Sequence, residues 1–105
     1  MEIKTNLYYY DFIKENPEFT GCVIDCNGDK FWYLNGLQHR EDGPALEWAN
    51  GSKFWHLNGK YHRTDGPAVE FADGAKYWYL NGKQMTEEEW TYTVRLNKLG
   101  EFLYR

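Results

Sequence analysis

Apolar and polar residues recur along this chain with a period of 23 residues. Setting residues 27–49 against residues 50–72 gives sixteen identities in 23 positions, and a truncated third copy runs from Asp73 to Lys83. A short fixed period of this kind is typical of stacked supersecondary units, each packed only against its neighbours. The sequence therefore predicts a repeat array rather than a fold with unrelated elements.

Each copy contains two strand-like runs. The first runs cover residues 30–34, 53–57 and 76–80, and Asn-Gly or Asp-Gly bounds each of them on both sides. These dipeptides accept positive φ at both central positions and favour type I′ hairpin turns. The second runs begin near His39 and His62 and end near Trp48 and Phe71. Asp-Gly-Pro interrupts them at residues 42–44 and 65–67, which predicts a bend or bulge there. We expect a mainly all-β fold, an antiparallel meander with one β-hairpin per 23-residue repeat.

Alternation along each strand sorts the side chains onto two faces. One face carries residues that are identical in all three copies, namely Trp32, Trp55 and Trp78 with Leu34, Leu57 and Leu80. We assign this face to the packed core and expect Leu46, Trp48, Val69 and Phe71 to join it. The other face is expected to be wetter; it carries Phe31, Tyr33, Phe54, His56, Tyr77 and Tyr79.

The ends of the chain are predicted to cap the array. Thr86 and Glu89 form a capping box, so a helix is expected from Glu87 to about Leu99, stopped by Gly100. Its apolar residues are expected to cover the open edge of the sheet; they are Trp90, Tyr92, Val94, Leu96 and Leu99. Residues 7–15 are expected to form a short helix or turn. The organisation is one domain, 1–105, made of an N-terminal cap (1–21), repeats (22–83) and a C-terminal helical cap (84–105).

Composition narrows the class of protein. Twenty of the 105 residues are aromatic, which is incompatible with a disordered chain. There is no run of 18 apolar residues to span a membrane and no visible signal peptide, so we expect a cytoplasmic protein without membrane contact. The net charge of −4 argues against a nucleic-acid partner. No cofactor is indicated.

The repeat resembles the MORN repeat, a 23-residue hairpin repeat, most clearly at residues 58–62 (N-G-K-Y-H) and 71–74 (F-A-D-G). A typical MORN copy has glycine after the histidine, whereas Arg40 and Arg63 stand there in this chain. The resulting H-R-x-D-G-P-A variant looks like the MORN-like repeats of bacteriophage and large DNA virus proteins. The resemblance implies a β-hairpin fold and a role in protein–protein contact. If the chain is phage-encoded, it also implies interference with a host factor.

Two sets of side chains are candidate binding residues. The first comprises His39, Arg40, His62 and Arg63, each pair followed by an aspartate, Asp42 or Asp65. Two arginines one repeat apart could clamp a phosphate or carboxylate, or each arginine could serve only its own hairpin. The second set is the aromatic row of Phe31, Tyr33, Phe54, His56, Tyr77 and Tyr79, which could stack on a partner's side chains or on sugars, or pack under the terminal segments.

No arrangement of residues points to catalysis or to metal binding. Cys22 and Cys26 lack the further ligands that a zinc site needs, and buried free thiols are the expected state. Ser52 is the single serine and has no counterpart in the other copies. We therefore expect a small non-enzymatic module that binds another protein, a host protein if the chain is viral. An anionic small ligand and a carbohydrate are the alternatives, and the open sheet edge allows a homodimer.

Overall fold

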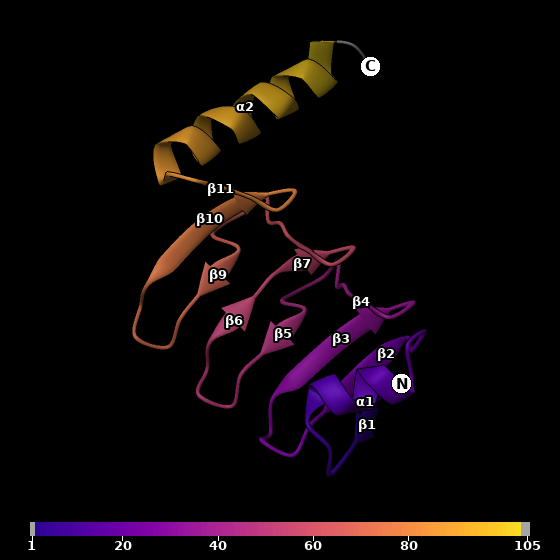
Figure 1. Cartoon of the computed structure of the whole chain (residues 1–105). Helices are drawn as coiled ribbons and strands as arrows, with labels where there is room; N and C mark the ends of the chain where they lie inside the picture. Colours follow the sequence, from indigo (N-terminus) through magenta and orange to yellow (C-terminus); the bar gives the residue numbers. More distant parts are fainter. Residues whose placement is uncertain (1, 104–105) are drawn as a thin grey trace.

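Part of each strand-like run of the sequence forms a strand, and most of these strands join one mixed sheet (Figure 1). The second runs form strands only at Leu46–Glu47 and Val69–Glu70. The computed structural model describes residues 2–103. The sheet has the order β1-β2-β3-β5-β6-β9-β10-β11, with β4 paired to β3, and β7 and β8 form a separate hairpin. The mainly-β expectation is confirmed. The elements are β1 (Glu2–Lys4), α1 (Tyr9–Glu15), β2 (Gly21–Ile24), β3 (Lys30–Leu34), β4 (Leu37–Gln38), β5 (Leu46–Glu47), β6 (Lys53–Phe54), β7 (His56–Leu57), β8 (Lys60–Tyr61), β9 (Val69–Glu70), β10 (Lys76–Leu80), β11 (Lys83–Met85) and α2 (Glu87–Leu103).

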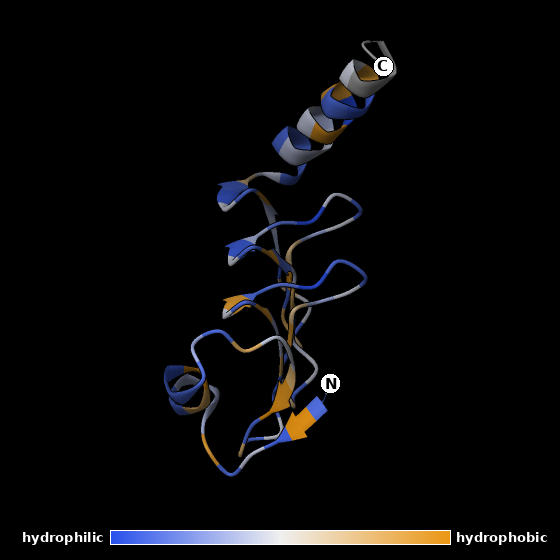
Figure 2. Cartoon of the chain, turned by 90° about the vertical axis from the view of Figure 1, so that its right-hand side faces the viewer, coloured by the Kyte–Doolittle hydropathy of each residue, from blue (hydrophilic) through white to orange (hydrophobic). Residues whose placement is uncertain are grey.

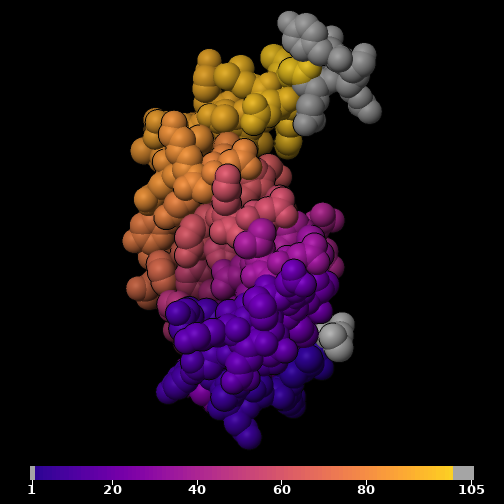
Figure 3. Space-filling model, turned by 45° about the vertical axis from the view of Figure 1, so that its right-hand side comes forward, coloured from indigo at the N-terminus to yellow at the C-terminus, as the bar shows by residue number. Residues whose placement is uncertain are grey.

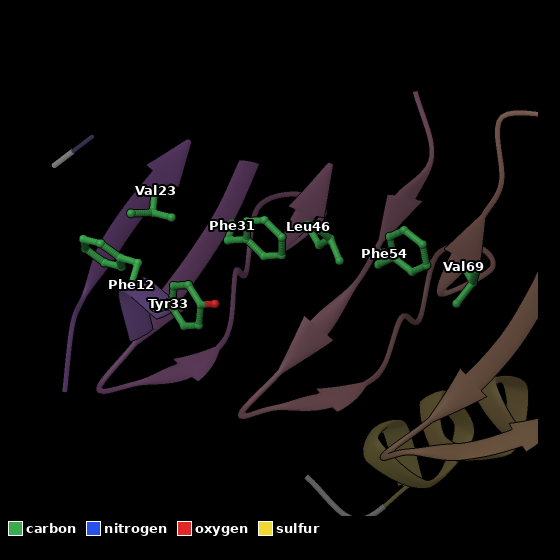
Figure 4. Packing of buried hydrophobic residues seen from close by; sticks show 7 residues of the cluster. All are labelled: Phe12, Val23, Phe31, Tyr33, Leu46, Phe54 and Val69. Atoms are coloured by element: carbon green, nitrogen blue, oxygen red, sulfur yellow. The ribbon is translucent and has the colours of Figure 1, made fainter. Parts of the chain in front are cut away.

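Strand pairing is antiparallel from β2 onward, and only β1 runs parallel to its neighbour β2. The registers place apolar residues opposite one another on consecutive strands, so that one row of side chains crosses the sheet. Figure 4 shows most of this row seen from close by. Its members are Val23, Phe31, Leu46, Phe54, Val69 and Tyr77.

The packed face is the opposite of the one expected from the invariant tryptophans. Phe31, Tyr33, Phe54 and His56 are buried, whereas Trp32, Trp55 and Trp78 are only half-buried. One reason is the position of α1, which lies on the Phe31 side and contributes a buried ring, Phe12. Over the second copy, rings from neighbouring strands pack on Phe54 instead. Leu46 and Val69 are buried as expected, but on this same side. We call the side that carries Phe31 and Phe54 the ring face, and the side that carries Trp32 and Trp55 the tryptophan face.

The turns divide into two types. Asn35, Asn58 and Asn81 have φ of about 50° and precede glycines with φ of 81–83°, which is the type I′ geometry expected there. In the Asn-Gly and Asp-Gly pairs that begin each copy, only the glycine has positive φ. In the second copy Gly51 donates to the Trp48 carbonyl oxygen and Trp48 donates to that of Ser52. These turns are therefore three-residue loops with a left-handed glycine, and the type I′ prediction was wrong for them.

The helix α2 begins as predicted and ends later. The Thr86 hydroxyl accepts a hydrogen bond from the Glu89 amide, and the Glu89 carboxylate accepts one from the Thr86 amide, which completes the capping box. Gly100 has no positive φ, so it does not stop the helix, which continues to Leu103. Val94 is buried, but Tyr92, Leu96 and Leu99 are exposed and do not cover the sheet edge. Figure 3 shows α2 leading away from the body at one end.

Candidate functional site

On the tryptophan face, an arginine from each complete copy stacks on that copy's tryptophan. The Cζ atom of Arg40 lies 4.0 Å from the ring centroid of Trp32, and that of Arg63 lies 3.7 Å from the centroid of Trp55. A guanidinium over an indole face gains cation–π attraction and covers apolar surface. We call each of these two units, with the aspartate that comes two residues after the arginine, a clamp.

Each arginine also forms hydrogen bonds with its own Asp-Gly-Pro loop. Arg40 Nε donates to Asp42 Oδ1 at 3.0 Å, and Arg40 Nη1 donates to the Pro44 carbonyl oxygen at 3.2 Å. Arg63 repeats these contacts with Asp65 and Pro67, and it also donates to Glu70 at 3.3 Å. The Asp-Gly-Pro loops that carry these partners bulge from the side of the sheet opposite α1 (Figure 2). The guanidinium groups are thus held within the chain.

The glycine and the histidine of the motif serve the same packing. A Cβ atom on Gly43 or Gly66 would lie only 3.0 or 2.8 Å from the arginine Cζ, so the guanidinium needs glycine beneath it. His39 Nδ1 accepts the amide of Asn58, and His62 Nδ1 accepts the amide of Asn81, each at 2.9 Å. Each histidine therefore joins one copy to the turn of the next, and this geometry accounts for the histidine, arginine, aspartate and glycine of H-R-x-D-G-P.

The six residues of the predicted aromatic row do not share one environment. Phe31, Tyr33, Phe54 and His56 are in the core, so the expectation of a wet row was wrong for them. Tyr79 is half-buried, and Tyr77 keeps 41% of its surface exposed. Phe54 packs against the rings of Trp48 and Phe71, and His56 packs against Tyr61. Tyr77 and Tyr79 belong to the last copy, which α1 does not reach (Figure 1).

Beyond α1, the ring face forms an open hollow of about 330 Å³. Rings from successive strands meet edge-on or tilted along its floor, as in Phe71 with Tyr77 at 5.9 Å and Tyr61 with Tyr79 at 4.9 Å between centroids. The residues that line it are Phe54, Tyr61, Val69, Phe71, Tyr77, Tyr79 and Gln84. We call this region the open hollow.

A second cleft, of about 390 Å³, lies where the start of α1 meets the ring face. His56 forms part of its wall, beside Tyr61, whose ring centroid is 4.3 Å away. His56 is only 5% exposed, and its Nδ1 atom has no hydrogen-bond partner. Burial lowers the pKa of His56 to about 4, so the imidazole is neutral at pH 7. We call this region the His56 cleft.

Burial also shifts the pKa values of two tyrosines near this cleft. It raises the pKa of Tyr33 to about 12, against the opposing effect of a hydrogen bond with Gln38, and it raises the pKa of Tyr61. In the strand registers, Tyr33 faces Gln38 and Tyr79 faces Gln84, whereas His56 faces Tyr61. The second copy thus carries the one imidazole of the ring face.

Sequence reasoning missed the acidic residues of the His56 cleft, Asp25 and Asp29. One signal was present, because both occupy repeat positions at which the copies differ. In the 23-residue frame Asp25 corresponds to Trp48 and Phe71, and Asp29 corresponds to Ser52 and Ala75. A motif built from the positions that the copies share does not include either aspartate.

The two cysteines differ in environment, since Cys22 is buried and Cys26 is exposed. The expectation of two buried thiols was wrong for Cys26, which lies just past the end of β2. Within residues 2–103, no three histidine, cysteine or acidic side chains gather closely enough to hold a metal ion. No helix of the described chain is both long and apolar enough to cross a bilayer.

Comparisons with protein-family models, with curated proteins and with solved structures return no match for this chain. The function of the protein is therefore inferred from its fold and its side-chain geometry.

Proposed function

We propose that this protein is a small non-enzymatic binding module, a stack of MORN-like hairpin repeats that holds an apolar segment of another protein in its open hollow. The observation that carries the proposal is the uneven cover of the ring face. Over the first copy, α1 seats Phe12 in the core and stacks Tyr9 on Phe31 with centroids 4.2 Å apart. Over the later copies, the same face carries the rings that line the open hollow. No helix of the described chain covers it there (Figure 1).

The exposed rings give this surface its binding capacity. Trp48 and Tyr77 keep 38% and 41% of their surface exposed, and they flank Phe71, which touches both rings. Clusters of exposed apolar side chains on a small protein mark sites of association, because covering them removes apolar surface from water. The helix α1 indicates the kind of partner that fits, a short amphipathic segment that places one or two rings against the sheet.

Two alternatives find less support. An anionic ligand held by Arg40 and Arg63 would have to compete with Asp42 and Asp65, which already neutralise the guanidinium groups. A carbohydrate usually stacks on a flat exposed ring, whereas the rings of the open hollow meet edge-on or tilted. Because the repeat resembles those of phage and large-virus proteins, the proposed partner is a host protein.

Site-specific photo-crosslinking tests the proposal. A photoreactive residue is placed at Tyr77 in the hollow or, as a matched control, at Tyr92, which is 66% exposed on α2. In a soluble extract of the source cells, position 77 should yield one dominant protein adduct that position 92 does not. Excess wild-type protein should suppress the adduct, and excess Tyr77→Ala protein should not. Equal adducts at both positions, or none at position 77, would refute the proposal.

A further inference from the structure

The His56 cleft differs from the open hollow in its charge. The two charged side chains in its wall are Asp25 and Asp29, and no lysine or arginine of residues 2–103 lines it. Neither aspartate forms an ion pair with a cation in the described chain. The repeats as a whole are electrically neutral, with seven basic and seven acidic residues in 27–83. Residues 1–26, which contribute Tyr8, Tyr9 and Asp25 to the wall, hold two basic and five acidic residues, so the N-terminal side of the cleft is acidic as well.

Neutral donors hold both carboxylates in place. Asp25 is 5% exposed and accepts hydrogen bonds from the amides of Asn27 and Asp29 through Oδ1 and from that of Tyr9 through Oδ2. Asp29 accepts the amide of Ala49 at 2.7 Å. Backbone amides fix the orientation of a carboxylate and leave its full unit charge, and a low-dielectric wall strengthens the attraction between that charge and a cation.

Aromatic rings complete the wall of the cleft. Trp48 is 38% exposed and lies 4.8 Å, centroid to centroid, from the buried ring of Phe54. Tyr61 and His56 stand beside them. The faces of indole and phenol rings attract cations, and Trp is the strongest of them. The nine-tenths-buried imidazole of His56, with its unpartnered Nδ1, adds a polar group that the protein itself leaves unsatisfied.

We propose that the His56 cleft binds a guanidinium group, with Trp48 and Tyr61 against its planar face and Asp29 against its edge. The chain uses the same chemistry in each clamp, where a guanidinium lies between an indole ring and an aspartate, as Arg63 does between Trp55 and Asp65. In the cleft the ring and the carboxylate come from the protein, and the cation comes from the ligand. The cleft shares Phe54 and Tyr61 with the open hollow, but Asp25, Asp29 and His56 line only the cleft, and the test of this site does not require the proposed function.

The positions that form the cleft also support a specific role. Asp25, Asp29, His56 and Tyr61 all lie where the three copies differ, whereas the residues of the clamps are identical in both complete copies. A cleft of this composition therefore exists once in the array. The guanidinium could be that of a free guanidino compound or that of an arginine side chain in a partner, since both present the same planar donor group.

Isothermal titration with matched ligands tests the proposal. N-acetyl-arginine amide should bind saturably at one site, and the citrulline analogue, which has the same shape without the charge, should bind at least roughly tenfold more weakly. A short glycine peptide with one central arginine separates the two sources. Tighter binding of the peptide than of the amide indicates a partner's side chain, and equal binding indicates a free compound.

Two variants locate the site. Asp29→Asn keeps an oxygen for the Ala49 amide and should weaken the binding of N-acetyl-arginine amide by about tenfold. Trp48→Leu should weaken the binding of the same ligand by about fivefold. The matched control is Asp42→Asn, which removes an aspartate of a clamp and should leave the affinity unchanged. Thermal melts confirm that each variant is folded. Equal affinity for the arginine and citrulline ligands, no saturable binding, or an unchanged affinity in Asp29→Asn would overturn the proposal.

Discussion

The two faces of the same strands are stabilised in different ways. On the tryptophan face, each complete copy covers its own tryptophan with its own arginine, and every participating residue recurs 23 positions later. On the ring face, the buried row of Phe31, Leu46 and Phe54 runs across several strands, and the residues around it change from copy to copy. Residues that recur maintain the stacking of the copies, and residues that vary give individual copies their own surfaces.

The truncated third copy covers its tryptophan, Trp78, differently from the two complete copies. The third copy has Thr86 where the complete copies have Arg40 and Arg63. Trp90 of α2 takes the place of the arginine and lies 4.7 Å from Trp78, and its indole donates to the Arg63 carbonyl oxygen at 2.9 Å. The last tryptophan is therefore covered by a ring of α2 and not by an arginine.

The largest effect on stability is expected when one ring is removed from each face of the segment Phe54–Trp55, at the end of β6. Phe54→Ala removes a ring that is 4% exposed and should lower the free energy of unfolding by about 3–5 kcal/mol. Trp55→Ala removes a larger but half-buried ring and should cost about 2 kcal/mol. Urea denaturation measures both, with Tyr92→Ala as an exposed control. A greater loss from Trp55→Ala would restore the tryptophan face as the main core.

Acid should act on the ring face through His56. Because its pKa is about 4 in the folded state and about 6.5 in the unfolded chain, the unfolded state takes up the proton first as pH falls. The contribution of neutral His56 is complete above about pH 6.5 and is lost as pH falls towards 4, a change on the order of 3 kcal/mol. The half-buried His62 has its pKa lowered in the same direction.

His56→Tyr separates these contributions, because the other copies carry tyrosine at this position. Denaturation midpoints measured between pH 7 and pH 4.5 should fall less in His56→Tyr than in the wild type. An identical pH profile for the two proteins would show that His56 does not titrate in this way.

The smallest effect is expected in a clamp. Arg63→Lys keeps the positive charge but loses the planar stack on Trp55 and the fixed hydrogen bonds to Asp65 and Pro67, so it should cost about 1 kcal/mol. Thermal or urea unfolding measures the change against Lys14→Ala, an exposed substitution on α1 that should be neutral. If Arg63→Lys also left the free energy of unfolding unchanged, the planar stack and the fixed hydrogen bonds of the clamp would not contribute to stability.

Much of the local structure could be predicted from the sequence. The asparagine–glycine turns at 35–36, 58–59 and 81–82 were predictable because only residues that tolerate positive φ fit both positions. The capping box of Thr86 and Glu89 was predictable because its hydrogen bonds join residues three apart. The His56 cleft was not predictable, because it brings together residues from α1, β5 and the turn before β3, whose proximity depends on the sheet.

The sequence by itself determined the period, the strands, the chain reversals and the start of the last helix, since each depends on residues close together along the chain. Which face of the sheet is buried was decided by the tertiary structure. The strands carry large rings on both faces, so alternation alone could not distinguish them. The difference arises because α1 places Phe12 on the Phe31 side, while Arg40 and Arg63 cover the tryptophans with a layer that remains half-exposed.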